Sequence, residues 1–333
     1  MAPKEDEGRG SSHRTHEPEE ELTRKEFAIL LVRDVAFAGI LVAIIFGSMF
    51  AYTQVWPPVV VVESGSMQHS HTRAYLGSID TGDVVLVQAV HSTSDIITYV
   101  QGRASGYETY SNYGDVIIFH PPGAPADVTP IIHRAILYAD LSASAWGGVD
   151  IPSLASFPDP WSATHPDGTP TTNTTGLGNV TLTMRSWASG FERRESLTYD
   201  LRILRKSGFL TKGDHNPSFD GPLTYVPPVP VSDIIGKARG ELPWFGLIKL
   251  TVTPTNGCCR AGWGDPRAPT NSWDSLSTSL VLIPVGIFLA DYGFALIERY
   301  WKSWRNARES RTDSAEGPEQ EDVPGRDSED RPK

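Results

Sequence analysis

The uncharged run Val35–Tyr52 (VAFAGILVAIIFGSMFAY) and the β-branched run Val59–Val62 (VVVV) that follows it set the plan of this 333-residue chain. With the preceding Phe27–Val32, the first run makes a helix of the length that a membrane crossing needs, about 20 apolar residues. Thr53–Pro58 (TQVWPP) then supplies an interfacial tryptophan and two helix-ending prolines. A cleaved signal peptide fits poorly, because the preceding segment is long and acidic and no small-residue cleavage pattern follows. We therefore expect a retained signal anchor over residues 27–55.

A second apolar segment, Leu276–Ile297, lies near the other end of the chain. It contains Pro284 and Asp291, and a charge at membrane depth is costly unless it has a partner. A buried helix packed on the folded domain is therefore the alternative to a membrane span. The flank Glu298–Arg311 is aromatic and basic, as is typical of a cytoplasmic membrane edge, and it favours the membrane. We expect a second transmembrane helix over residues 275–298.

Basic residues lie beside both apolar segments, on the sides that face the chain ends. They are Arg24, Lys25, Arg33, Lys302, Arg305, Arg308 and Arg311. The positive-inside rule then places both termini in the cytoplasm and the region between the segments outside it. Two N-glycosylation sequons, at Asn173 and Asn179, fall in that outer region and agree with this topology. We expect a two-pass protein of the cell membrane with an extracytoplasmic domain.

The region between the apolar segments predicts a mainly β domain, because short β-branched runs separated by turn residues are typical of strands. The expected strands are Val59–Val62, Asp83–Val90, Asp115–Phe119, Ile131–Tyr138, Leu201–Leu204, Ile234–Ala238 and Leu247–Thr253. Residues 140–200 are rich in Ser, Thr, Pro and Gly and are expected to be an insertion or long loop. The β domain would then consist of two parts, 56–139 and 201–274.

The chain ends, the net charge and the cysteines limit the possible partners and sites. Residues 1–26 and the last part of 299–333 are charged and polar, so we expect disordered cytoplasmic tails there. The net charge of −11 argues against nucleic acid as the main partner, because a polyanion requires a basic surface. Cys258 and Cys259 are adjacent, and we expect no bridge because neighbouring cysteines pair only with strain. No spaced Cys/His set predicts a zinc site.

Three stretches of the β domain carry side chains that could do chemistry. The first, Glu63–Met67 (ESGSM), has a serine beside a glycine, and a serine nucleophile needs both a base and a backbone oxyanion site. The second contains His133, which could be that base because histidine exchanges protons near neutral pH. The third, Gly213–Asp220 (GDHNPSFD), could supply a carboxylate that orients the histidine. Taken singly, the first two stretches fit an ordinary turn and an ordinary strand better than a catalytic group, and the third also fits a solvated turn.

In combination and order, these stretches resemble type I signal peptidases. An apolar span leads into Ser-Gly-Ser-Met, then Gly-Asp-Val-Ile-Ile-Phe, then His-Arg, then Gly-Asp-x-Asn-Pro-x-x-Asp. The resemblance covers about 56–138 and 203–240 and implies a signal-peptidase-like β fold. It implies that Ser66 is the nucleophile and that Ser64 assists the Ser66 backbone N–H in the oxyanion hole. Bacterial members have a lysine base where this chain has His133, as the archaeal and endoplasmic reticulum-type enzymes do.

The resemblance therefore implies a Ser-His-Asp arrangement. It favours Asp220 as the third member and Asp214 as a structural support, although the residues alone leave both carboxylates open. One departure is His69, which stands where the family usually has proline. His69 and His71 are expected to be loop residues and not the base. No metal or organic cofactor is expected.

The function that the resemblance implies is that of a membrane-bound serine endopeptidase that removes signal peptides from exported precursors through an acyl-enzyme. Its partners would be signal-peptide-bearing precursors, the lipid membrane and the secretion channel. The cleavage-site segment would pair in extended form with an edge strand, Val59–Val62 or Asp83–Val90. The alternatives are an inactive paralogue that binds signal sequences or scaffolds a processing complex, and an anchored adhesive β domain. A self-cleaving repressor-type protease ranks last, since it would need a lysine base and no membrane span.

Overall fold

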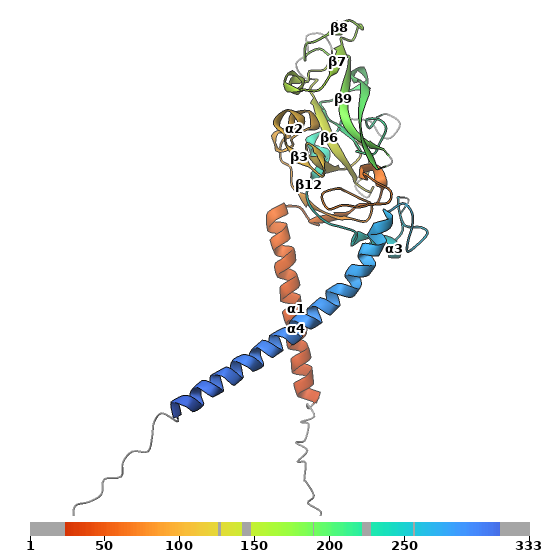
Figure 1. Ribbon diagram of the computed structural model, residues 1–333. Coiled ribbons are helices and arrows are strands. Elements are labelled where there is room, and N and C mark those ends of the chain that lie inside the picture. The colour runs from red at the N-terminus through yellow and green to blue at the C-terminus, as the bar shows by residue number, and fades with distance from the viewer. Residues whose placement is uncertain are drawn as a thin grey trace, which may run out of the picture.

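The protein combines a mainly β domain with two long helices that leave it on the same side (Figure 1). The helices are α1 (Arg24–Thr53) and α4 (Thr270–Asp313). The computed structural model describes residues 24–125, 128–141, 148–188, 190–221, 228–255 and 257–313. The expected tails lie largely outside these ranges, but α4 continues past the expected end of the second span at residue 298.

Both long helices expose apolar surface. The segments Phe27–Thr53 and Thr270–Asn306 each contain a stretch long and apolar enough to cross a membrane, and no part of either stretch is buried in the protein. Exposed apolar surface of this extent is unusual for a monomer in water. The alternative of a second segment buried against the β domain is therefore wrong. Pro284 lies inside α4 without ending the helix.

The centre of the domain is a six-stranded antiparallel sheet with the strand order β1-β2-β12-β5-β6-β11. Its strands are β1 (Val59–Val61), β2 (Val84–Gln88), β5 (Val116–Phe119), β6 (Ile131–Ala139), β11 (Gly208–Lys212) and β12 (Ile234–Leu242). Five of the expected strands are thus confirmed. Every residue of β5 is buried, because this short apolar strand lies inside the sheet and is covered on both faces.

Two expected strands are wrong. Leu201–Leu204 instead contains a 3-10 turn, Leu201–Ile203, in which the Asp200 side chain accepts from the Arg202 N–H. Leu247–Thr253 instead belongs to the helix α3 (Gly246–Val252). Its buried Leu247 and Leu250 are three residues apart, which is the spacing of one helix face and not of a strand.

The described part of residues 140–200 forms a second antiparallel sheet and not a long loop. Its strand order is β10-β9-β7-β8, made of β7 (Trp161–Thr164), β8 (Pro170–Thr171), β9 (Asn179–Ala188) and β10 (Phe191–Asp200). The alternate β9 residues Val180, Leu182 and Met184 join the same hydrophobic core as Ile136 and Leu137 of β6. The insertion therefore shares its core with the central sheet.

Smaller elements complete the fold. They are α2 (Tyr99–Ser105), the hairpin β3 (Glu108–Thr109) and β4 (Asn112–Tyr113), and the 3-10 turns Gly65–Met67, Thr93–Asp95, Pro152–Ser156 and Val231–Asp233. The β3–β4 hairpin lies between α2 and β5 in the chain and contributes backbone carbonyls to the site described below.

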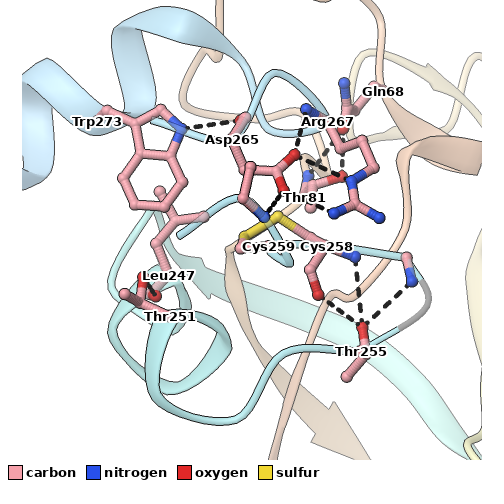
Figure 2. The surroundings of a disulfide bond; sticks show 12 residues. Gln68, Thr81, Leu247, Thr251, Thr255, Cys258, Cys259, Asp265, Arg267 and Trp273 are labelled. Carbon is pink, nitrogen blue, oxygen red and sulfur yellow. Dashed lines mark hydrogen bonds and ion pairs between the residues drawn. A yellow bond between two sulfur atoms is a disulfide. The ribbon is translucent and has the colours of Figure 1, made fainter. Parts of the chain in front are cut away.

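The two adjacent cysteines form a disulfide, contrary to the expectation (Figure 2). Both side chains are fully buried in a cluster with Leu247, Leu250 and Trp273, where α3 meets the start of α4. The Thr255 hydroxyl donates to the Cys258 carbonyl at 3.0 Å and accepts from the Cys258 N–H at 3.3 Å. Apolar burial and this local hydrogen bonding hold the tight turn that brings the two sulfur atoms together.

A buried acidic cluster precedes and flanks β2. Asp80 accepts a hydrogen bond from the Ser78 hydroxyl at 2.7 Å, and its own N–H donates to Asp83 at the same distance. Burial, only partly opposed by the Ser78 hydrogen bond, raises the pKa of Asp80 to about 6. Burial likewise raises the pKa of Glu241, which accepts from the Gly77 N–H, to about 7.

We expect the free energy of unfolding to fall as the pH rises from about 4 to about 7. A carboxyl whose pKa is higher in the folded than in the unfolded state binds more protons when folded, so stability is lost as the proton leaves. For Asp80, a rise from 3.8 to about 6 is worth roughly 3 kcal/mol at neutral pH. Asp80→Asn should therefore stabilise the protein by roughly 1–3 kcal/mol at pH 7.5 and much less at pH 4.5.

Denaturant unfolding in detergent at the two pH values measures this effect. Asp95→Asn is the matched control, because Asp95 is a half-buried residue whose pKa is lowered, and not raised, by hydrogen bonds from the His91 and Ser92 N–H groups. That variant should show no gain at pH 7.5. An Asp80→Asn protein no more stable than wild type at pH 7.5 would contradict the prediction.

Candidate active site

Ser66 lies in the 3-10 turn Gly65–Met67, directly after the edge strand β1. Met67 anchors this turn, because its side chain is only 1% exposed and packs in the core with Val62 and Val85. The Ser64 and Ser66 hydroxyl oxygens lie 3.4 Å apart. The fold thus presents both serine hydroxyls together at the end of an edge strand.

His133 lies in β6 and contacts Asp220. Its Nδ1 is 2.5 Å from Asp220 Oδ2. Thr211, in β11, donates its hydroxyl to the same carboxylate oxygen at 2.7 Å, and its carbonyl accepts from the Asp220 N–H at 2.9 Å. Both His133 and Asp220 are buried. With Nδ1 held by the carboxylate, Nε2 is the imidazole nitrogen that can exchange a proton with another group.

Ser64, Ser66, His133 and Asp220 line one cavity of about 690 Å³. Its walls come from the end of β1, the start of β6 and the residues Pro254, Thr255, Gly257 and Arg260, and its apolar lining includes Val61, Val62, Ile131 and Ile132. The serine turn (Gly65–Met67) lies close to β6, with Cα atoms of the two segments within 8 Å of each other. A hydroxyl, an imidazole and a carboxylate from distant parts of the chain therefore meet in one partly apolar hollow.

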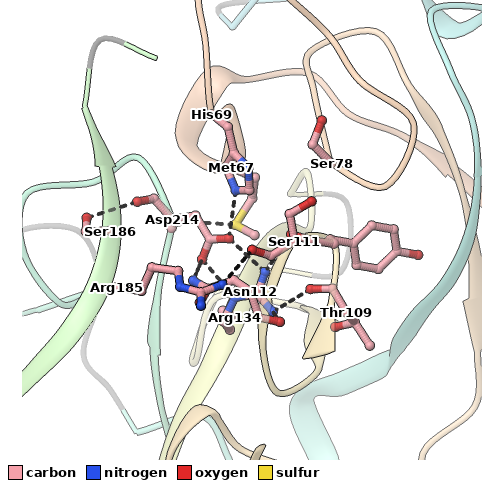
Figure 3. Close-up of polar contacts among 12 residues, drawn as sticks. Met67, His69, Ser78, Thr109, Ser111, Asn112, Arg134, Arg185, Ser186 and Asp214 are labelled. Atoms are coloured by element: carbon pink, nitrogen blue, oxygen red, sulfur yellow. Dashed lines mark hydrogen bonds and ion pairs between the residues drawn. The ribbon is translucent and has the colours of Figure 1, made fainter. Parts of the chain in front are cut away.

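Asp214 lies in a separate buried cluster (Figure 3). Its two carboxylate oxygens accept from Arg134 Nε at 2.8 Å and Nη2 at 2.7 Å, and Oδ2 lies 3.2 Å from His69 Nε2. Burial by itself would raise the pKa of Asp214, but the Arg134 guanidinium and its hydrogen bonds outweigh burial and hold the pKa below its usual range. Of the two carboxylates left open by the residues, Asp220 contacts His133 and Asp214 contacts Arg134.

The loop that carries Asp214 packs directly on the serine turn. The His215 N–H donates to the Ser66 carbonyl at 2.9 Å. Gly213 approaches so closely that a Cβ at this position would lie 2.5 Å from the Ser66 carbonyl oxygen. The Lys212 ammonium donates to the Gly213 carbonyl at 3.0 Å, and burial lowers the pKa of this lysine. The Gly-Asp-His sequence thus fixes the backbone of the serine turn.

Comparison with protein-family models finds no match to this chain, and comparison with curated proteins finds no significant match. Within the ranges that the structure describes, no group of three or more His, Cys, Asp or Glu side chains could hold a metal ion.

Of the two strands expected to bind substrate, only one has a free edge. Asp83–Val90 contains β2, which pairs with β1 on one side and β12 on the other, so that expectation is wrong. Val59–Val62 contains β1, which lies at the edge of the sheet. Because β1 leads directly into the serine turn, an extended peptide paired with it would pass Ser66.

Sequence reasoning missed Thr211, Arg134 and Lys212 as parts of the site. Thr211 and Lys212 lie in β11, a strand that the sequence did not predict. Arg134 was noted only as the neighbour of His133, yet its guanidinium donates to the carbonyls of Thr109 at 3.0 Å and Gly114 at 2.8 Å. An arginine in the middle of the apolar run of β6 was the available signal, because a buried charge requires a partner.

Proposed function

We propose that the chain is a membrane-anchored serine endopeptidase of the type I signal peptidase family, in its Ser-His-Asp branch, which removes signal peptides from exported precursor proteins. The observation that carries the proposal is the 2.5 Å contact between His133 Nδ1 and Asp220 Oδ2 in the cavity that Ser66 also lines. The order of the sequence motifs and the two exposed apolar helices support it.

In the proposed mechanism, His133 Nε2 takes the proton of the Ser66 hydroxyl as Oγ attacks the scissile carbonyl carbon. Asp220 stabilises the imidazolium through Nδ1. The Ser66 backbone N–H and the Ser64 hydroxyl donate to the oxyanion. The imidazolium then protonates the leaving amine, the C–N bond breaks, and an acyl-enzyme remains. His133 finally takes a proton from water as the water oxygen attacks the acyl carbon, and the imidazolium returns that proton to Ser66 Oγ as the ester C–O bond breaks.

The substrate would bind along β1 in extended form, with main-chain hydrogen bonds to the edge of the sheet. The apolar lining from Val61, Val62, Ile131 and Ile132 suits small uncharged side chains next to the scissile bond. In the proposed topology both termini are cytoplasmic and the β domain is outside the cell membrane. The signal helix then lies in the same bilayer as α1, which raises the effective concentration of a weakly bound substrate.

Cleavage of a signal-peptide-bearing precursor by the purified full chain in bilayers tests the proposal. We expect the wild type to release the signal peptide and Ser66→Ala to lower kcat by about 10³- to 10⁶-fold, as removal of a nucleophile does. Ser94→Ala, at an exposed serine of the same domain, is the matched control and should cleave normally. A precursor with lysine in place of the small residue before the cleavage site should stay uncut.

Two results would overturn the proposal. A wild type that binds the precursor without cleaving it would favour the inactive, signal-binding paralogue. Equal cleavage by wild type and Ser66→Ala would mean that the activity comes from another site or another protein.

A further inference from the structure

His69 and the insertion of residues 140–200, neither of which the motif order explains, meet beside the serine turn. Trp187 of β9 stacks face to face on the His69 ring, with ring centroids 3.8 Å apart and planes 5° from parallel. Both side chains are buried. A proline, usual in the family at position 69, could not make the polar contact that His69 Nε2 makes with Asp214. The departure from the family pattern thus coincides with a contact from the insertion.

The same part of β9 holds the backbone of Asp214. The Asp214 carbonyl accepts from the Trp187 N–H at 3.3 Å and from the Ser186 hydroxyl at 3.2 Å. Figure 3 shows the contact with Ser186. The Lys212 ammonium donates to the Ser186 hydroxyl at 3.2 Å. The insertion therefore reaches Asp214 twice, through His69 at the carboxylate and directly at the carbonyl.

Asp214 and its neighbour in turn contact the serine turn. The His215 N–H donates to the Ser66 carbonyl at 2.9 Å, and the Asp214 N–H points to Met67 Sδ at 3.5 Å. Direct contacts therefore run from Trp187 through His69 and the Asp214 loop to Ser66. All members of this path are buried or half-buried, so a displaced ring has few other places to go.

We propose that Trp187 and His69 are positioning residues for Ser66. Trp187 holds the His69 ring, His69 and Arg134 together hold the Asp214 carboxylate, and the Asp214 loop holds the serine turn at the distance that His133 requires. The insertion is then a structural part of the active site. The catalytic consequence rests on the proposed function, whereas the mechanical coupling from β9 to the serine turn does not.

Hydrogen exchange of full-chain variants is the first test, with Trp187→Ala and Trp187→Phe as the variants and Phe191→Ala as the control. Phe191 lies at the tip of the same β9–β10 hairpin and is 76% exposed. In hydrogen exchange, Trp187→Ala should accelerate exchange of residues 64–70 and 213–216 about tenfold or more and leave β5 unchanged. Trp187→Phe should restore most of the protection, since a ring can still stack on His69.

Cleavage kinetics provide the second readout. Trp187→Ala should lower kcat roughly 10- to 100-fold, because a small displacement of a nucleophile is costly, and KM should change less than about twofold. Trp187→Phe should recover most of kcat, and Phe191→Ala should match wild type. His69→Ala should resemble Trp187→Ala, and the double variant should be no worse than either single one, because the two rings act as a unit.

The inference would be overturned if Trp187→Ala showed the same hydrogen-exchange rates and the same kcat as Phe191→Ala. Uniform loss of protection that includes β5 and is not restored by phenylalanine would also overturn it, because Trp187 would then be an ordinary core residue. A wild type without cleavage would instead overturn the proposed function, and the exchange data would still decide whether β9 holds the serine turn.

Discussion

In the proposed mechanism, Asp220→Asn is expected to lower kcat roughly 10,000-fold while the protein stays folded, by the same logic as in Ser-His-Asp enzymes. The amide keeps the shape of the carboxylate, and the Thr211 hydroxyl, which contacts the same Oδ2 position as His133 Nδ1, can turn to accept from an NH2 group placed there. The amide cannot stabilise an imidazolium, and it can offer an N–H to His133 Nδ1. That contact would favour the tautomer with the proton on Nε2, which is unable to accept the proton of Ser66.

Single-turnover cleavage of the precursor, together with thermal unfolding of the same preparations, measures the effect. Thr211→Val is the informative control, because it is nearly isosteric and removes the 2.7 Å hydrogen bond to Asp220. It should lower kcat by about tenfold, which is on the order of one lost hydrogen bond to a charged group. An Asp220→Asn enzyme within tenfold of wild type would show that Asp220 does not orient the base.

Much of the central sheet could be predicted from local pattern, because strands such as β5 and β6 are apolar and β-branched. Strand β11 (GFLTK) could not. Its Thr211 and Lys212 are fully buried, and they are buried because Asp220, Ser186 and the Gly213 carbonyl lie opposite them. Local pattern carries no information about such tertiary partners, so a polar residue in a core strand is read as exposed.

The insertion illustrates the opposite error, in which composition hides regular structure. Its Ser and Thr content suggested a loop, yet these side chains form cross-strand pairs on the outer face of β9 and β10. The hydroxyls of Thr181 and Thr198 lie 2.8 Å apart, and those of Thr183 and Ser196 lie 2.9 Å apart. Because β-branched threonine suits a half-exposed strand, alternation with Val180 and Leu182 was the better signal.

For the candidate site, the order of motifs selected four of the residues that line the cavity, Ser64, Ser66, His133 and Asp220. It left open which of the two carboxylates contacts His133. Asp214 and Asp220 lie on one loop, so spacing alone does not say which of them turns to His133. The direction of each side chain depends on residues from other strands: Thr211 hydrogen-bonds Asp220, and Arg134 pairs with Asp214. That choice is tertiary, and only the three-dimensional arrangement makes it.

The contrast between the carboxylates predicts a second large effect, this time on stability. Asp214→Asn is expected to lower the free energy of unfolding by about 3–5 kcal/mol, because removing one member of a buried ion pair leaves the other charge uncompensated. Arg134 is completely buried, so water cannot take over the lost interaction. Denaturant unfolding of the full chain in detergent measures the loss, with Asp220→Asn as the matched carboxylate-to-amide control.

The pH dependence separates loss of the ion pair from a general packing defect. A carboxyl whose pKa is lowered in the folded state stabilises the protein above its unfolded pKa, near 3.8, and this stabilisation disappears as the pH falls further. Wild type should therefore lose stability more steeply than Asp214→Asn below about pH 4, so that the two proteins converge in acid. A constant difference in the free energy of unfolding at all pH values would mean that Asp214→Asn acts through altered packing.

Replacing both partners, as in Arg134→Met with Asp214→Leu, should recover part of the lost free energy of unfolding, because no charge is then left buried alone.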